Sequence, residues 1–222
     1  MLRNPNGLSF AVVALLGGVI FADLLSVFAD FELRTAVTDQ PGEDVSPRDL
    51  AMAFLAATGL LQILLLLATA TVFIIWFHRL RKNAEVWAGD LQGRTPGWAI
   101  GGWFIPLANL WIPHGVAADI WRASRAEPSA ADRRGELGLL HAWWAAFVVD
   151  TIVARVAGRV YDRAETFEEY ASAANWLVAS DALDIVAAVL AILFVRRLTS
   201  MQHLKATGMI PAAVTKSRAP AQ

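Results

Sequence analysis

Long apolar stretches alternate with short charged segments along the chain, and four of these stretches are long enough for a membrane-spanning helix. A helix rises about 1.5 Å per residue, so about 20 apolar residues cross a hydrocarbon core about 30 Å thick. The clearest stretch, Leu50 to Phe77, contains no charged residue. We therefore expect an all-α integral membrane protein, with a single membrane domain over residues 1–205 and a flexible cytoplasmic tail over residues 206–222. The pattern places its transmembrane helices at residues 8–29, 50–77, 137–158 and 170–195.

A fifth apolar stretch, residues 96–121, does not have the pattern of an uninterrupted span. The run from Thr95 to Ala118 carries no charge, but Pro106 and Pro113 within it each remove a helical hydrogen bond. Four tryptophans in the stretch favour the boundary between lipid headgroups and hydrocarbon, where an indole ring stays partly wet. We expect a Pro-broken, Trp-rich segment that is re-entrant or interfacial, and that either lines a cavity or plugs the bundle at the inner leaflet.

Basic residues indicate on which side of the membrane each connection lies, because Lys and Arg near span ends are retained in the cytoplasm. Suppose that the N-terminus is inside and that residues 96–121 return to the side from which they enter. Most of the 19 Lys and Arg residues then lie inside. The acidic connection at residues 30–49, which holds two prolines and a glycine, lies outside and is expected to be irregular. We expect a multi-pass protein of the plasma (inner) membrane with both termini cytoplasmic.

Carboxyl groups inside the predicted spans are the second unusual feature. A carboxylate near the middle of a membrane costs about 2.5 to 3.5 kcal/mol, so we expect these groups to face the protein interior. Together with Asn109 they form a candidate functional polar cluster. Two interpretations stay open: a proton or cation site, or hydrogen-bonded contacts between helices with Arg155 as the partner of one carboxylate. The four carboxyl groups belong to Asp23, Asp150, Asp181 and Asp184.

Composition and motifs exclude several classes of function. A net charge of −1 argues against a nucleic-acid partner, since phosphate binding needs a concentrated basic surface. The chain has no cysteine, and His78, His114 and His141 lie in different segments, so we expect neither a metal site nor a cofactor. The sequence contains no nucleophile elbow and no glycine-rich phosphate loop, and we therefore expect no enzymatic activity.

The middle of the chain, residues 76–124, resembles a known family. The resemblance rests on a dense motif that follows an arginine-rich segment containing Phe77, Arg79, Arg81, Asn83 and Ala84. The motif residues are Pro96, Gly97, Trp98, Gly102, Trp103, Phe104, Ile105, Pro106, Asn109, Leu110, Trp111, Pro113, Asp119, Ile120, Trp121, Arg122 and Ser124. This pattern is similar to the domain of unknown function 4328 family, whose members are bacterial multi-pass membrane proteins, many from actinobacteria. The resemblance implies a membrane fold, but no activity, substrate or catalytic residue.

Two functions stay open for such a non-enzymatic membrane protein. The first is a scaffold or regulatory subunit that acts through contacts within the bundle and through its cytoplasmic face. The second is a small transporter or channel component in which the aspartates hold an ion or protons. The lipid bilayer is one expected partner. A membrane-protein partner or a second copy of the chain is the other, because four spans leave little internal room for transport.

Overall fold

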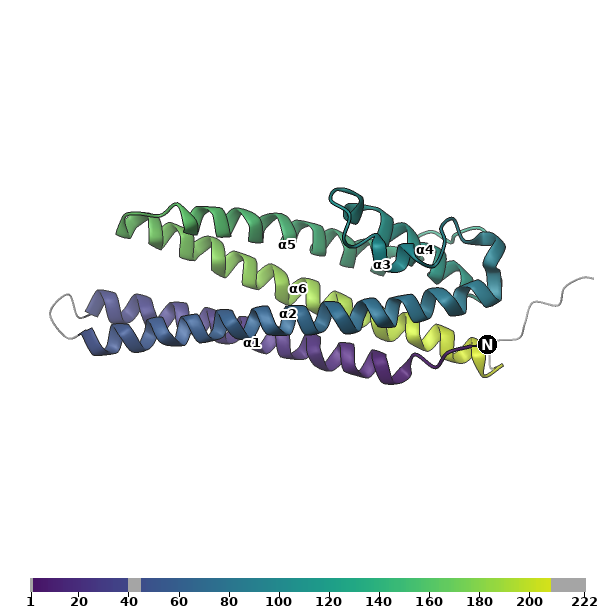
Figure 1. Ribbon diagram of the computed structural model, residues 1–222, viewed down its shortest axis with the longest axis horizontal. Helices are drawn as coiled ribbons and strands as arrows, with labels where there is room; N and C mark the ends of the chain where they lie inside the picture. Colours follow the sequence, from purple (N-terminus) through teal and green to yellow (C-terminus); the bar gives the residue numbers. More distant parts are fainter. Residues whose placement is uncertain (1, 40–44, 209–222) are drawn as a thin grey trace, which may run out of the picture. The chain divides into compact units, whose positions relative to one another are not determined.

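The computed structural model describes residues 2–39 and 45–208, and every regular element in those two ranges is a helix (Figure 1). The elements follow one another along the chain, with short helices and turns between the second and third of the four longest helices. In order they are α1 (Asn6–Asp39), α2 (Val45–Ala88), η1 (Gly89–Leu91), α3 (Trp98–Gly101), η2 (Ala108–Leu110), α4 (Ile112–Ala123), α5 (Gly138–Asp162) and α6 (Phe167–Ala206).

Four of these helices are long and apolar enough to cross a membrane, which confirms the predicted all-α membrane protein. In α1, α2 and α6 the apolar side chains are distributed around the whole helix, as expected for a span that faces both protein and lipid. Phe21 of α1, Leu64 of α2 and Val189 of α6 are examples of large apolar side chains that remain exposed. The membrane-crossing stretches are Asn6–Glu32, Met52–Leu91, Gly138–Asp162 and Ser172–Ala206.

The connection predicted to be irregular at residues 30–49 is largely helical, and that prediction was wrong. α1 continues to Asp39 and α2 begins at Val45. Acidic residues do not by themselves stop a helix, and the breakers Pro41 and Gly42 come only after α1 ends. Pro47 lies in the first turn of α2, where proline is tolerated because the N–H it lacks has no helical partner. Residues 40–44, and residues 209–222 of the predicted tail, lie outside the part that the structure describes.

The chain divides into two compact units, and we describe each by itself. The first contains the Trp-rich segment together with the ends of α2 and α6, and we call it the motif unit. The second contains the greater part of the membrane-crossing helices, and we call it the span unit. The motif unit comprises Met1–Ser9, Ile74–Leu137 and Arg196–Gln222, and the span unit comprises Phe10–Phe73 and Gly138–Val195.

The motif unit has an apolar core made by three helices. Trp76 and Leu80 of α2, Ile120 of α4 and Leu198 of α6 are all fully buried. The indole N–H of Trp76 donates a hydrogen bond to Thr199 Oγ1 at 3.0 Å, so the polar edge of this buried ring is satisfied. The core therefore fixes the position of α4 against the ends of α2 and α6.

Close packing also holds the broken segment against this core. The ring of Phe77 meets that of Trp103 edge-on, with 6.0 Å between ring centroids. A Cβ atom at Gly102 would lie only 2.7 Å from Ile112 Cγ2, so only glycine allows the end of α3 to approach the start of α4 this closely.

The span unit is held together by aromatic stacking and by small residues. Trp143 of α5 stacks on Phe194 of α6 with 4.6 Å between ring centroids, and Phe73 of α2 lies 5.7 Å from the same indole. Ala22 of α1 and Ala188 of α6 are almost completely buried, which permits close approach of helices at these points. The unit thereby brings polar side chains from its helices into a common interior.

Candidate functional site

The four aspartates predicted to face the protein interior all belong to the span unit. Asp23 lies on α1, Asp150 on α5, and Asp181 and Asp184 on α6. Asp23 is almost completely buried, at 1% exposed, and the other three are partly buried. The two residues on α6 are three apart, so they share one helix face.

Gln62 of α2 joins two of these carboxyl groups. Its side-chain Nε2 donates a hydrogen bond to Asp23 Oδ1 at 2.9 Å and another to Asp181 Oδ1 at 3.1 Å. Ser26 of α1 also forms a side-chain hydrogen bond with Asp181. A primary amide has two N–H groups, so Gln62 uses both on carboxyl oxygens and has none left for another acceptor.

The carboxyl groups influence one another electrostatically. Asp23 and Asp150 each interact with both Asp181 and Asp184, and Asp23 and Asp150 also interact with each other. Two buried oxygens of the cluster, Asp23 Oδ2 and Asp150 Oδ1, have no hydrogen-bond partner among the described residues. A buried charged oxygen without a partner is unfavourable, so this arrangement requires that something reduce the negative charge.

Arg155 does not supply that compensation, and the prediction that it pairs with one aspartate was wrong. Its side chain is exposed, and the ion pairs found in the described part of the chain leave it out. Arg155 follows Asp150 by five positions on α5, which turns it about 140° around the helix axis and away from the cluster. The described span-unit residues therefore give these carboxyl groups an amide and a hydroxyl as partners, but no Lys or Arg.

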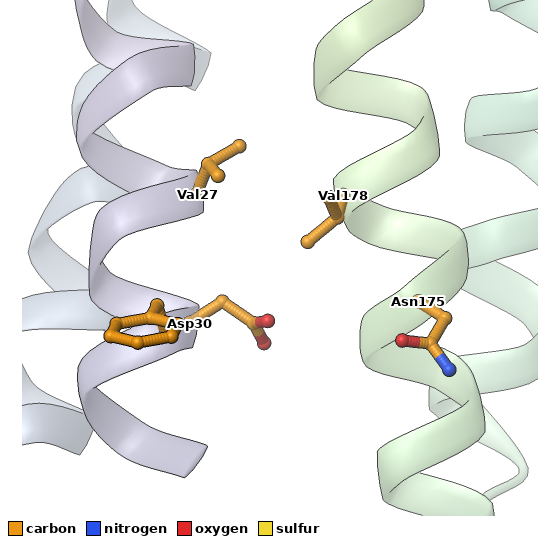
Figure 2. Close-up of a pocket in the computed structure, with 5 residues that line it drawn as sticks. Val27, Asp30, Asn175 and Val178 are labelled. Carbon is orange, nitrogen blue, oxygen red and sulfur yellow. The ribbon is translucent and has the colours of Figure 1, made fainter. Parts of the chain in front are cut away.

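A pocket lies one helical turn from the buried carboxyl groups, between α1 and α6. It has a volume of about 220 Å³ and is lined by Val27, Asp30, Phe31, Asn175 and Val178. Figure 2 shows Val27 facing Val178 across the gap, with Asp30 and Asn175 directed into it from opposite helices. The pocket is connected to the cluster electrostatically as well, since Asp30 interacts with Asp181.

Asn109 does not join the aspartates in the described cluster. It belongs to η2 in the motif unit and is partly buried, with its backbone N–H bonded to Ile105 O at 3.0 Å. The described residues contain no group of three or more His, Cys, Asp or Glu side chains arranged to hold a metal ion. The candidate site consists of four carboxyl groups with Gln62 and Ser26.

The motif residues with charged side chains, Asp119 and Arg122, form contacts from the second half of α4. Asp119 Oδ2 accepts a hydrogen bond from the N–H of Gly93 at 3.1 Å, and Asp119 Oδ1 forms an ion pair with Arg122 at 3.4 Å. Arg122 also binds Asp132 at 2.8 Å, and Arg125 binds the same carboxylate at 2.7 Å. The hydrogen bond from Arg122, followed by that from Arg125, lowers the pKa of Asp132 to about 2.

The remaining motif residues shape the broken segment. Pro96 and Gly97 form the turn that leads into α3, and the carbonyl of Pro96 lies 3.2 Å from His78 Nδ1. Pro113 is in the first turn of α4. Among the tryptophans, Trp121 is buried and Trp103 is partly buried, whereas Trp98 and Trp111 are exposed.

A second buried polar network, which the sequence pattern does not predict, lies in the motif unit. Asn83 Nδ2 donates to Gln202 Oε1 at 3.0 Å and to Arg3 O at 2.8 Å, while Asn83 Oδ1 accepts from Arg3 N at 2.8 Å. Gln202 Nε2 donates to Leu80 O at 3.1 Å and to Ser124 Oγ at 3.3 Å. Every side-chain amide atom in this network is hydrogen-bonded, and neither amide can titrate.

Comparison with known proteins adds the family. A family model described as Domain of unknown function (DUF4328) matches residues 43–200, a range that includes Asp150, Asp181 and Asp184 but not Asp23. No curated protein and no solved structure matches the chain. Because the family match takes in most of the 222 residues, the chain belongs to the DUF4328 family.

Proposed function

We propose that the protein binds protons at the carboxyl cluster of its span unit, and that it is a component of proton-coupled transport across the plasma (inner) membrane. The observation that carries this proposal is the unbalanced site itself. Asp23 Oδ2 and Asp150 Oδ1 are buried without a hydrogen bond, and the described residues around them provide no Lys or Arg partner. Intramembrane carboxyl groups of this kind are typical of proton relays.

The geometry around Gln62 gives the reason for choosing protons. One nitrogen atom lies within hydrogen-bonding distance of both Asp23 Oδ1 and Asp181 Oδ1, so these two oxygens are within ~6 Å of each other. Two negative charges at ~6 Å repel by about 3 kcal/mol if the effective dielectric constant is about 20. A proton on one of the two carboxyl groups removes this repulsion and provides an O–H donor for an unpaired oxygen.

The pocket between α1 and α6 supports an exchange route for these protons. Asp30 and Asn175 are polar groups in its lining, and Val27 and Val178 lie one turn from Asp23 and Asp181 respectively. A hollow that holds water next to a buried carboxyl group allows protons to enter and leave. Because one four-helix chain has little internal room, we propose that transport uses an oligomer or a membrane-protein partner.

Reaction with dicyclohexylcarbodiimide tests proton binding directly, because this apolar reagent adds to protonated carboxyl groups in membranes. We expect the modification of Asp23 or Asp181, followed by mass spectrometry in detergent, to fall as the pH is raised from about 5 to about 9. The Asp23→Asn variant identifies the contribution of one group, and the exposed acid Glu127 serves as the unreactive internal control. Absence of modification at every pH would contradict proton binding.

Proton flux tests transport separately. In proteoliposomes containing a pH-sensitive dye, a potassium diffusion potential should acidify or alkalinise the lumen faster with the wild-type protein than with Asp181→Asn. Equal rates for wild-type and empty vesicles would reject transport by this chain alone, even if carbodiimide labelling shows bound protons. Carbodiimide labelling requires neither a second copy of the chain nor a partner. Labelling without flux would therefore mean that the chain binds protons but does not transport them alone.

The scaffold or regulatory subunit remains the second candidate, and one observation favours it. The amide network of Asn83 and Gln202 is buried and fully hydrogen-bonded, which makes the motif unit a rigid platform of the kind that a scaffold needs. Under this alternative the protein carries no flux, and Asp181→Asn leaves its biological role unchanged.

The proposed orientation places both termini in the cytoplasm. It is supported by the concentration of Lys and Arg in and after the C-terminal parts of the second membrane-crossing stretch and the last one. Because the chain lacks cysteine, a single Ala126→Cys variant in intact cells provides a clean test. Ala126 is exposed, so a membrane-impermeant thiol reagent should label it only after the cells are opened. Labelling in intact cells would reverse the orientation.

A further inference from the structure

The broken segment, residues 96–121, carries an exposed apolar surface that the proposed function does not use. Six of its large apolar side chains are between 37% and 71% exposed in a part of the sequence that carries no charge. The most exposed are Phe104 at 71% and Leu107 at 69%. We call this set the wedge, and it consists of Trp98, Ile100, Phe104, Ile105, Leu107 and Trp111.

The backbone of the wedge satisfies most of its own hydrogen bonds despite two prolines. The N–H groups of residues 98–104 and 108–111 each donate to a carbonyl group within residues 95–111. A loop in water has no need of this, because solvent can satisfy its polar groups. In hydrocarbon each unsatisfied backbone group costs several kcal/mol, so local satisfaction is what a lipid-facing segment requires.

Contacts with α2 fix the wedge beside the end of the uncharged run Leu50 to Phe77. Phe77 packs on Trp103, and His78 Nδ1 lies 3.2 Å from Pro96 O. These two α2 residues lie within the stretch Met52–Leu91 and are followed immediately by a group of basic residues, Arg79, Arg81 and Lys82. Such basic residues are typical of the headgroup region, so the broken segment lies at the level where hydrocarbon meets headgroups.

The tip of the wedge has a backbone conformation that an exposed leucine does not favour. Leu107 has a φ angle of 65° and a ψ angle of −46°, at the centre of a γ-turn in which Ala108 N donates to Pro106 O at 2.8 Å, and this conformation is strained for a residue other than glycine. Neither the local backbone nor burial in the protein accounts for leucine at this position, since its side chain is 69% exposed. An apolar environment outside the protein would account for it.

We infer that the wedge inserts into one leaflet of the membrane, with Phe104 and Leu107 among the acyl chains and with Trp98 and Trp111 at the headgroup boundary. The partner of this surface is the lipid leaflet on the side of the basic residues that follow Phe77. The inference is independent of proton binding, because it concerns the motif unit and uses none of the carboxyl groups. It makes the family motif a membrane-surface anchor attached to the helix bundle.

Spin-label accessibility tests the insertion in the full-length protein. Single-cysteine variants Leu107→Cys and Phe104→Cys, and the exposed control Ala126→Cys, carry a nitroxide in vesicles of phosphatidylcholine and phosphatidylglycerol in equal parts. Labels at 107 and 104 should collide more with oxygen, which dissolves in lipid, than with a water-soluble nickel chelate. The label at 126 should show the reverse ratio. Phe104→Cys carries the prediction alone if a change at Leu107 disturbs folding.

Two results would overturn this inference. Accessibility to the nickel chelate equal to that at residue 126 would place the wedge in water, and low accessibility to both reagents would mean that a protein surface covers it. A further variant sharpens the result, since Leu107→Asn keeps a side chain of similar size but makes it polar. With the label at residue 104, Leu107→Asn should raise nickel-chelate accessibility severalfold, whereas Leu107→Met should leave it unchanged.

Discussion

The two buried polar networks of this protein differ in chemistry and in completeness. In the motif unit, the side chains of Asn83 and Gln202 are neutral amides, and all of their polar atoms are hydrogen-bonded. In the span unit, four carboxyl groups share one amide, Gln62, and the Ser26 hydroxyl, and two buried oxygens have no partner. One network has donors and acceptors in balance, and the other has an excess of acceptors.

We propose that this difference separates polar groups that serve structure from polar groups that serve function. A complete neutral network stabilises a single arrangement of helices, because losing any member leaves a buried group unsatisfied. An acceptor-rich acidic site is poorly explained as a helix contact, since amides or hydroxyls would make the same contact at lower cost. The excess of acceptors becomes useful if protons occupy the site, and removing it should therefore affect function more than stability.

The largest effect on stability is expected at Gln202. Replacing it by leucine removes hydrogen bonds to Leu80 O and Ser124 Oγ and takes away an acceptor from Asn83. Each buried group left unsatisfied costs about 1 to 3 kcal/mol, so we expect Gln202→Leu to lower the free energy of unfolding by about 3 kcal/mol. Thermal unfolding in detergent, followed by tryptophan fluorescence, measures the change.

Gln92 provides the matched control for this substitution within the same unit. Its side chain is partly buried, and its hydrogen bonds to Ala88 O and Asp119 O are long, at 3.3 and 3.4 Å. Gln92→Leu should therefore have a much smaller effect. If the two variants are equally stable, the amide network is not what holds the motif unit together, and the contrast between the networks fails.

The second prediction concerns Asp23, where we expect the substitution to raise stability and not to lower it. In Asp23→Asn the amide oxygen can still accept from Gln62, the charge is removed, and the new N–H groups can donate to a neighbouring carboxyl group. We expect stabilisation by about 1 kcal/mol, which raises Tm by about 2 to 4 °C, together with loss of proton flux. The exposed residue Asp90 offers the control Asp90→Asn, for which no comparable change in Tm is expected.

A clear loss of stability in Asp23→Asn would instead support a structural role for the carboxylate. The same unfolding and flux measurements distinguish these outcomes, because losing a structural carboxylate lowers Tm, whereas losing a proton-binding carboxylate raises Tm and removes the flux. The sign of the change in Tm is therefore more informative than its size.

The helical architecture and the acidic residues of the site could be predicted from hydropathy, but their partners could not. Uncharged stretches of sufficient length determine the membrane-crossing helices, and a carboxyl group within such a stretch must face the interior. Gln62 was missed even though it interrupts the leucine-rich run of the second span, and this interruption was the available signal. Asn83 and Gln202 lie near helix ends, where amides commonly face headgroups, so their burial depends on packing that local sequence does not encode.

The errors have similar causes. Acidic residues and prolines are typical of loops and so hide the helical ends of α1 and α2, but here the prolines lie after one helix and in the first turn of the next. Pairing of Arg155 with an aspartate fails because its angle around α5 turns it away from Asp150. The γ-turn at Leu107 could not be predicted, because leucine is disfavoured there.

The smallest expected effect concerns Asp132, an acid whose environment is the reverse of the carboxyl cluster. Two arginines contact it, and Arg122 and then Arg125 lower its pKa from 3.8 to about 2. Because the pKa is lowered on folding, the contribution to stability is present above about pH 4. It is lost as the pH falls through about 2. The site is at the surface, where solvent screens ion pairs, so the contribution is small.

Asp132→Asn should therefore lower Tm slightly at pH 7, and the difference from wild type should disappear as the pH approaches 2. Tryptophan fluorescence during thermal unfolding at a series of pH values measures this, with Glu127→Gln as the control at an exposed acid of the same connection. A difference that persists at pH 2 would mean that the loop geometry, and not the charge of Asp132, is responsible. A difference that disappears would show that acids with cation partners in this protein behave as simple ion pairs. The aspartates on the membrane-crossing helices lack such partners. They would then differ from Asp132 in that they need protons to be stable.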